Sequence, residues 1–568
     1  MSPRNVNKFN MDTRLSILSQ LAQRVRGEQE SSNGSVYGTR TRRKVLAVAV
    51  ITDAGNPGHD ASLLLPVPLV RVGSFMVCKG DHTTPTLEEG EVAIVWDQLE
   101  LHTYIGGPQD ATPIRYTITT EEEFSNTFLL AKVSFSLDIS AKDSTSSIRN
   151  LVQSLTEQLE SSAACFRLLY SKLVLQNNKG ILSLGKPLSD SNEPVGSLSK
   201  SGTGNKKSST PPMASFQFMF SRSVCPTTNA PVVRIDKRKT SILSALLNGE
   251  VLVYLRKTMA VSDVANLLSR GMVRQLHLAE HWLGKQLADT KLKGSLTPVN
   301  SVHFIVGHVV SVIYPDETEE SYLEEYRKEV HKALLLPLNR PMIKRGNKQT
   351  QNHASTKSSV LTNTHVGLSS SNVNGIVRIV QGTYGYHHYM QDHFDDNKWG
   401  CAYRSLQTLV SWFKYQGYTD NPIPTHRDIQ KCLADIGDKP SSFIGSKQWI
   451  GSTEVGYVLD NMFNVGSRFI YVSSGEELAS YGRQLTMHFE IQGTPIMIGG
   501  GVLAHTIIGV DWSDETGDIN FLILDPHYTG SEDLGVIQSK GWCGWKSLKF
   551  WKPGAYYNLC LPQRPHCV

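Results

Sequence analysis

The sequence predicts an α+β protein of several domains, and three observations lead to this prediction. A chain of 568 residues is longer than a single hydrophobic core usually organises. Short strand-like apolar runs alternate with segments whose apolar residues recur every three or four positions, as in amphipathic helices. Two polar stretches, 183–212 and 346–375, hold few large apolar side chains and are therefore predicted to be flexible linkers.

The linkers divide the chain into three parts. Residues 1–182 are predicted to form an N-terminal α/β domain, 213–345 a middle α/β domain that recruits an adaptor or substrate, and 376–568 a compact α+β domain. The elements expected in the first two parts are strands at 44–52, 92–96 and 128–137, and helices at 146–169, 262–287 and 319–335.

Composition and charge point to a soluble intracellular protein. The chain is 40% hydrophobic with a net charge of +5, and no apolar run approaches the roughly 20 residues of a membrane-spanning helix. The N-terminus lacks the apolar core of a secretory signal, and the eight cysteines show no framework spacing, so we expect free thiols. The basic cluster 40–44 is more typical of a solvated strand entry than of a nucleic-acid contact, and no direct nucleic-acid partner is expected.

The middle domain contains a possible zinc motif, His277-x-x-Glu280-His281. The two histidines are four residues apart and would share one face of a helix. No third ligand is evident, however, and paired surface histidines at this spacing are common. We therefore predict neither a metal nor a cofactor.

Cys401 is the candidate nucleophile. Apolar residues after it recur at helical spacing, whereas Asp395, Asp396 and Asn397 before it are residue types that cap helix starts. Cys401 is thus expected in the first helical turn, where free N–H groups and the helix dipole stabilise a thiolate.

Two histidines could serve as the base for this thiol. His505 begins one predicted strand, and His527 follows Asp525-Pro526 at the end of the next. Asp525 could orient either imidazole, as the third member of a thiol–imidazole–carboxylate triad. Physical reasoning from the residues leaves both histidines open.

The motifs WGCAYRSLQT, LDPHYTG and GWCGW through YYNLCLPQRP resemble those of cysteine peptidases specific for ubiquitin-fold modifier 1, in particular the long, type 2 branch. This resemblance implies a papain-like fold for the last domain. It also implies that the catalytic residues are Cys401, Asp525 and His527, with an oxyanion donor on Tyr389. The family usually has Gly-Trp-Gly-Cys where Lys398 precedes Trp399, and we expect Lys398 to need a negative φ there.

The resemblance implies a reaction and partners. The expected activity is cleavage after the C-terminal glycine of the modifier, both from conjugated lysines and from its precursor. We expect the glycine tail to run past Trp399, Gly385, Gly499 and Gly500. The expected partners are the modifier, its conjugates, ribosomal ones among them, and an adaptor anchored in the endoplasmic-reticulum membrane that binds the N-terminal region. That region is similar to an MPN-type domain and, without any H-x-H pair, would be free of metal.

The expected location is the cytoplasm, peripherally at the endoplasmic reticulum, with the nucleus as a further compartment. Two alternatives stay open. An autophagy-type cysteine peptidase shares W-G-C and D-P-H motifs, although the continuation AYRS argues against it. Alternatively, the first 345 residues make the chain chiefly a recruitment scaffold, with the helix at 319–335 as a partner surface.

Overall fold

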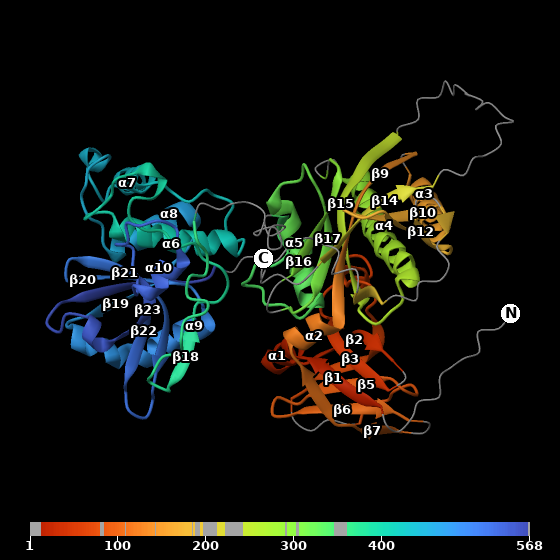
Figure 1. Cartoon of the computed structure of the whole chain (residues 1–568), viewed down its shortest axis with the longest axis horizontal. Coiled ribbons are helices and arrows are strands. Elements are labelled where there is room, and N and C mark those ends of the chain that lie inside the picture. Colours follow the sequence, from red (N-terminus) through yellow and green to blue (C-terminus); the bar gives the residue numbers. More distant parts are fainter. Residues whose placement is uncertain are drawn as a thin grey trace. The chain divides into compact units, whose positions relative to one another are not determined.

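The computed structural model describes residues 13–41, 43–79, 84–107, 110–142, 144–183, 186–187, 194–196, 213–221, 242–289, 292, 294–302, 306–345 and 360–565 (Figure 1). The chain forms two compact units. One comprises Met1–Leu338 and Ile343–Thr350, and the other comprises Asn339–Met342 and Gln351–Cys567. Each unit is described by itself below.

The first unit contains an eight-stranded sheet. Its strand order is β7 (Ala111–Pro113), β6 (Leu101–Gly106), β5 (Val92–Trp96), β4 (Val70–Val77), β2 (Ser32–Arg40), β3 (Lys44–Thr52), β1 (Arg14–Leu18) and β8 (Tyr116–Thr119). Helices α1 (Ser19–Gly27) and α2 (Glu121–Thr127) connect to this sheet. The strands predicted at 44–52 and 92–96 are confirmed as β3 and β5.

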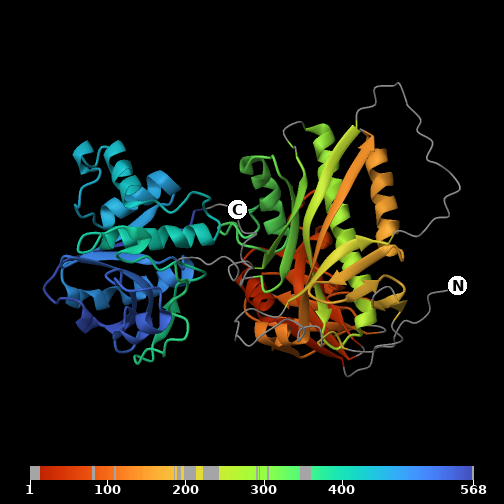
Figure 2. The same cartoon turned by 45° about the horizontal axis from the view of Figure 1, so that its top comes forward.

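A nine-stranded sheet completes the first unit. Its order is β13 (Lys186–Pro187), β12 (Gly180–Ser183), β11 (Leu173–Gln176), β10 (Ala164–Leu168), β14 (Met213–Phe220), β9 (Phe128–Lys142), β15 (Ile242–Arg256), β16 (Leu296–Val302) and β17 (Val309–Pro315). Helices α3 (Thr145–Glu160) and α4 (Val264–Ala288) lie side by side against the long pair β9 and β15 (Figure 2). Helix α5 (Glu320–Ala333) follows β17.

This second sheet crosses the boundary that we predicted at 183–212. Strands β9–β12 lead up to that stretch, the short strand β13 lies within it, and β14–β17 follow it, so one sheet joins the predicted N-terminal and middle domains. The decisive contact is the antiparallel pairing of β9 with β15, from Phe128↔Arg256 to Ile242↔Lys142. Local sequence does not encode such long-range pairing. Most of 183–212 lies outside the described residues.

The helix predicted at 146–169 is also shorter than expected. It ends at Glu160, and Ala164–Leu168 forms β10. The helices predicted at 262–287 and 319–335 are confirmed as α4 and α5, with small differences at their ends.

The second unit is built on a seven-stranded sheet. Its order is β19 (Ser467–Val472), β24 (Tyr557–Pro562), β20 (Ile496–Gly500), β21 (Leu503–Trp512), β22 (Ile519–Leu524) and β23 (Cys543–Ser547), and β18 (Ile376–Ile379) also pairs with β21. Its helices are α6 (Cys401–Tyr415), α7 (His426–Asp435), α8 (Ser452–Phe463), α9 (Gly482–Ile491) and α10 (Leu534–Ser539).

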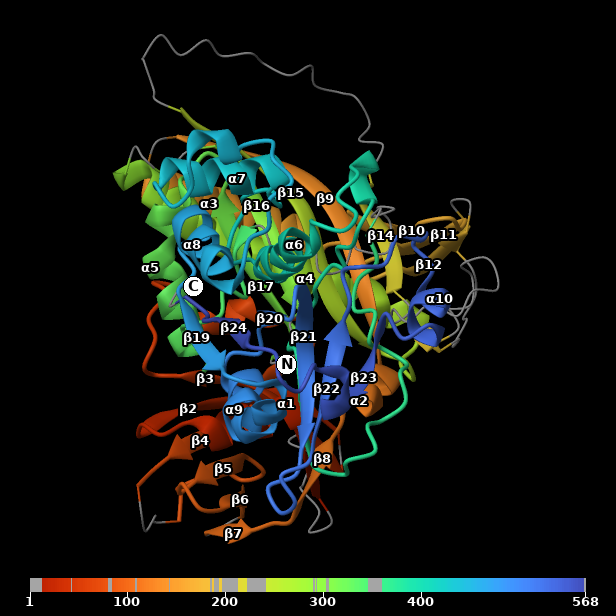
Figure 3. The same cartoon turned by 90° about the vertical axis from the view of Figure 1, so that its left-hand side faces the viewer.

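The alternation of side chains along these strands produces two hydrophobic cores. On one face, Met497, Leu522 and Leu524 pack with α6, α7 and α8. On the other face, Ile498 and Phe521, among others, pack with α9. Helix α6 lies against β20 and β21 (Figure 3). Cys401, the first residue of α6, therefore belongs to the core that this helix shares with β20, β21 and β22.

The linker predicted at 346–375 is only partly described. Residues 346–359 lie outside the described residues, whereas 360–375 pack on the second unit: Asn363 N–H donates to the Tyr384 carbonyl at 3.1 Å, and Thr364 is fully buried. No helix in the part of the chain that the structure describes is long and apolar enough to span a bilayer.

Candidate active site

Cys401 is the first residue of α6, as predicted. Four apolar side chains hold this helix on the sheet and are fully buried: Leu406, Leu409, Val410 and Phe413. The Cys401 N–H has no carbonyl partner outside the helix, as expected of an N–H in the first helical turn, and it interacts with the Tyr389 hydroxyl. This N–H and the positive end of the helix dipole lie beside the thiol of Cys401, a residue that is 9% exposed.

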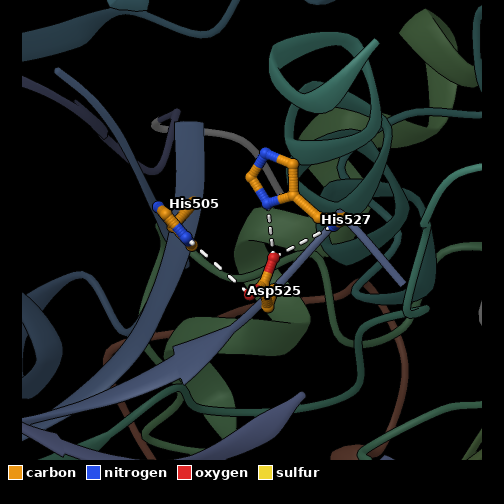
Figure 4. Close-up of side chains that lie close together, drawn as sticks. All are labelled: His505, Asp525 and His527. Carbon is orange, nitrogen blue, oxygen red and sulfur yellow. Dashed lines mark hydrogen bonds and ion pairs between the residues drawn. The ribbon is translucent and has the colours of Figure 1, made fainter. Parts of the chain in front are cut away.

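Asp525 and His527 lie at the end of β22 and form a tight pair (Figure 4). The Nδ1 atom of His527 lies 2.6 Å from Asp525 Oδ1, and the His527 backbone N–H donates to the same oxygen at 3.0 Å. Pro526 between them directs its carbonyl to Tyr389, whose N–H donates to it at 3.0 Å. Because the carboxylate accepts at Nδ1, the Nε2 atom of His527 is left for the thiol.

Electrostatics favour an ion pair between Cys401 and His527. Burial is the largest single influence and disfavours the thiolate, but the interactions with His527, Tyr389 and the Ala504 backbone together lower the pKa of Cys401. Burial likewise disfavours the imidazolium, but hydrogen bonding to Asp525 and the neighbouring Cys401 raise the pKa of His527 to about 9. The Nε2 atom has no partner of standard hydrogen-bond geometry, as is common before a substrate binds.

Tyr389 lies next to this pair. Its ring meets that of His527 edge-on at a centroid distance of 5.3 Å. Burial, followed by the nearby Cys401, raises the pKa of the Tyr389 phenol. The hydroxyl thus keeps its proton and can donate a hydrogen bond to a developing oxyanion.

Successive side chains of β21 point to opposite faces of the sheet, and this places His505 on the other side of Asp525 from Cys401. Ala504 belongs to the core that α6 covers, whereas the His505 ring contacts Phe550 and Trp551 at centroid distances of 5.1 and 5.9 Å. His505 Nε2 lies 3.8 Å from Asp525 Oδ2 (Figure 4). Of the two histidines that the sequence left open, His527 is therefore the one that reaches Cys401.

A buried ion pair, which we did not predict, fixes the segment between Tyr389 and Cys401. Asp396 is fully buried and accepts from Arg404 Nε at 2.6 Å and from the Met390 N–H at 2.8 Å. Arg404 Nη2 donates to the Gln391 carbonyl at 2.9 Å. Burial opposes the ionisation of Asp396, but the interactions with His426 and Arg404 prevail and lower its pKa.

This arrangement corrects the role expected of Asp396. Its carboxylate does not cap α6, whose N-cap is Gly400. A Cβ atom at Gly400 would lie 2.6 Å from the Asp396 side chain, so only glycine leaves room for this carboxylate. The signal in the sequence was an acidic residue eight positions before an arginine in the helix; spacing alone did not show that they pair.

The same segment contains several residues in the left-handed region. Met390, Asp392, His393 and Lys398 have φ values of 64°, 59°, 56° and 73°. The expectation that Lys398 needs a negative φ was therefore wrong. The backbone keeps the left-handed conformation that glycine favours, and Lys398 bears a strain of about 1–2 kcal/mol.

The predicted tail groove is only partly supported. A hollow of ≈ 310 Å³ opens beside the triad and is lined by Gly500, Gly501, Leu503, His505, Asp525, His527, Phe550, Trp551, Lys552 and Tyr557. Gly499 is not part of this lining and pairs with Ala504. Trp399 instead lines a second hollow of ≈ 430 Å³, with Phe394 and His426.

Gly385 does not belong to the groove. Its N–H donates to Ser411 Oγ at 2.8 Å. Ser411 lies ten residues beyond Cys401, or about 15 Å along α6 at the usual helical rise. The small size of Gly385 serves packing against the helix and not the substrate.

The histidines of the zinc-like motif do not converge. His277 is partly exposed and lies 3.5 Å from Glu280, whereas His281 packs against His59 and Tyr326. Within the described ranges, the only group of three or more potential metal ligands is His505, Asp525 and His527.

Comparisons with known proteins agree with this geometry. Residues 375–560 match peptidase family C78, and residues 149–353 match the N-terminal region of ubiquitin-fold modifier 1 specific protease 2. Human Ufm1-specific protease 2 is 40% identical over 439 residues, which cover 74% of this chain and 93% of that protein. The chain belongs to the Ufm1-specific protease 2 family.

Other members of the Ufm1-specific protease 2 family support the assignment. The chicken protein is 48% identical over 343 residues, which cover 60% of this chain and 74% of that one. The crystal structure of UfSP from C. elegans matches with a TM-score of 0.66 at 26% identity, covering 98% of this chain and all of that one. The chain is thus an α+β cysteine peptidase with a C-terminal C78 domain. The resemblance inferred from its motifs is confirmed, and the autophagy-type alternative is set aside.

Proposed function

We propose that this enzyme cleaves after the C-terminal glycine of Ufm1, releasing the modifier from conjugated lysines and maturing its precursor. The observation that supports this most is the convergence of Cys401, His527, Asp525 and Tyr389 at the start of α6, in a chain whose relatives are named Ufm1-specific proteases. A thiolate, a protonated imidazole and a phenolic donor are the groups that acyl transfer requires.

In the acylation step, the Cys401 thiolate attacks the carbonyl carbon of the terminal glycine. The oxygen of the tetrahedral intermediate becomes negative and is held by the Tyr389 hydroxyl and the Cys401 N–H, each donor contributing about 3 kcal/mol in comparable sites. His527 then donates its Nε2 proton to the leaving amine, the carbon–nitrogen bond breaks and a thioester forms. Asp525 keeps the imidazole oriented throughout.

In the deacylation step, His527 takes a proton from a water molecule, which attacks the thioester carbonyl. The carbon–sulfur bond breaks, Cys401 returns as the thiolate with His527 protonated, and the released carboxylic acid of the modifier loses its proton to solvent. The same cycle serves a lysine conjugate and a precursor, because only the leaving amine differs.

The test is cleavage of a Ufm1 precursor and of a lysine-linked Ufm1 conjugate by the full chain. Cys401→Ser should abolish both reactions, and residual activity of even about one tenth would contradict the assignment. An electrophile attached to the C-terminus of Ufm1 should modify Cys401 alone among the eight cysteines, as read by peptide mass spectrometry. Labelling of another cysteine would contradict the nucleophile.

We further propose that the first unit recruits the peptidase to conjugates, ribosomal ones among them, through an adaptor at the endoplasmic reticulum. In support, the four residues proposed to act in catalysis all lie in the second unit, and the region 149–353 matches the N-terminal model of this family. Removal of residues 1–338, which keeps Asn339–Met342 of the second unit, should spare cleavage of a soluble precursor and impair deconjugation on isolated microsomes. Equal loss of both activities would contradict this division.

A further inference from the structure

The cluster of His505, Asp525 and His527 has a feature that the proposed peptidase cycle does not use. One potential ligand atom from each residue lies within 4.8 Å of the other two (Figure 4). The peptidase cycle needs only the contact between Asp525 and His527. His505 lies on the far side of the carboxylate from Cys401 and has no part in that cycle.

The two oxygens of Asp525 differ in their surroundings. Oδ1 accepts both hydrogen bonds from His527, whereas Oδ2 accepts none within the described part of the chain. Oδ2 faces His505 Nε2 at 3.8 Å, which is too long for a direct hydrogen bond. Two ligands of a tetrahedral Zn²⁺ at its usual bond lengths lie about 3.3 Å apart. His505 Nε2 and Oδ2 would therefore have to approach by about 0.5 Å, and His527 Nδ1, which lies 2.6 Å from Oδ1, would have to move away as the ion replaces its proton.

The cluster borders open space. All three residues line the hollow of ≈ 310 Å³, which has room for an ion and its water. Lys552, a lysine in the lining of the hollow, has its Nζ atom 3.5 Å from the Gly501 carbonyl oxygen.

We propose that His505, Asp525 and His527 form an inhibitory site for Zn²⁺, with water from the hollow as the fourth ligand. Two imidazoles and one carboxylate are the ligand set of many zinc sites with an open position. The ion binds His505 Nε2, the Asp525 carboxylate and His527 Nδ1, and the Nδ1 proton leaves to solvent.

Inhibition follows from the position of the ion. An imidazole that holds Zn²⁺ on Nδ1 retains its Nε2 proton and can no longer exchange it with the leaving amine or with water. Asp525 is withdrawn from its orienting role at the same time. The thiol of Cys401 is not a ligand, so binding does not require it. The inhibitory effect rests on the proposed peptidase function, but the binding itself does not.

The test therefore begins with an inactive protein. Zn²⁺ binding to full-length Cys401→Ala is measured by calorimetry and by competition with a chromophoric chelator. The same measurement is made after adding His505→Phe, which preserves an aromatic ring against Phe550 and Trp551. His505→Gln serves as a second variant, and circular dichroism checks that each protein is folded. Adding His277→Ala instead is the matched control, because this histidine belongs to the other zinc-like motif.

We expect Cys401→Ala to bind one equivalent of Zn²⁺. Both His505 variants should bind Zn²⁺ roughly 100-fold more weakly, because the loss of even an outer partner of a metal site lowers metal affinity by about 10- to 100-fold. His277→Ala should bind normally. Equal Zn²⁺ affinity and stoichiometry with and without His505 would overturn the site, whatever the substrate of the enzyme. With Cys401 present, Zn²⁺ should inhibit precursor cleavage, and His505→Gln should raise the half-inhibitory concentration relative to its own activity. Cleavage that is equally sensitive in both proteins would overturn the inhibitory role.

Discussion

Arg404→Met tests whether the buried ion pair holds the site together. Asp396 is fully buried and Arg404 is 1% exposed, so the variant leaves a carboxylate without its main partner in a place that water does not reach. Breaking a buried pair from one side usually costs about 3–5 kcal/mol. We expect the lower half of this range, because His426 Nε2 lies 3.0 Å from Asp396 and can take over part of the charge.

The double variant isolates the cause. In Arg404→Met with Asp396→Asn, no charge is left buried, so the second change should restore about 1–3 kcal/mol of the loss. The matched control is Arg483→Met. This arginine also pairs with an aspartate, Asp514, at 3.0 Å, but both side chains are more than half exposed, and we expect a loss of at most about 1 kcal/mol.

The assay is hydrogen exchange of α6 peptides followed by mass spectrometry in increasing urea, which reports the stability of the second unit alone. Cleavage of the Ufm1 precursor is measured beside it. The kcat of Arg404→Met should fall by up to about 100-fold, because the segment from Tyr389 to Cys401 loses its anchor. If Arg404→Met cost no more than Arg483→Met, or if the double variant were no better than the single one, the pair would not be what holds this segment.

Three further predictions concern the site. Activity should decline above about pH 9, because the pKa of His527 is raised from its ordinary 6.5 to about 9, so the imidazolium predominates below that pH and is lost as the pH rises through it. In the pH profile of kcat/KM, Asp525→Asn should shift this decline toward pH 6.5. If the decline stayed near pH 9 in the variant, it would report the titration of a group other than His527. Tyr389→Phe should lower kcat by about 100- to 1000-fold with little change in KM, and a loss confined to KM would contradict an oxyanion role. Lys398→Gly should raise the melting temperature, because glycine relieves the strain of about 1–2 kcal/mol at a φ of 73°, whereas Lys398→Ala should not; equal melting temperatures for the two would contradict this strain.

Sequence alone determined the features that depend on neighbouring residues. Helical spacing after Cys401 predicted α6 and placed the thiol in its first turn. The spacing of apolar residues likewise predicted strand β3 and helix α5, because each pattern is complete within about fifteen residues. The motifs around Cys401 and His527 also identified the family, since they are short and contiguous.

The tertiary structure decided everything that joins distant residues. The pairing of β9 with β15 merged two predicted domains into one sheet, and no local pattern carries that information. The alternation of β21 turned Ala504 toward α6 and His505 away from it, which selected His527 as the partner of Cys401. Burial made Asp396 an ion-pair partner instead of a helix cap, because a carboxylate removed from water needs a charged neighbour, and Arg404 Nε lies 2.6 Å from it.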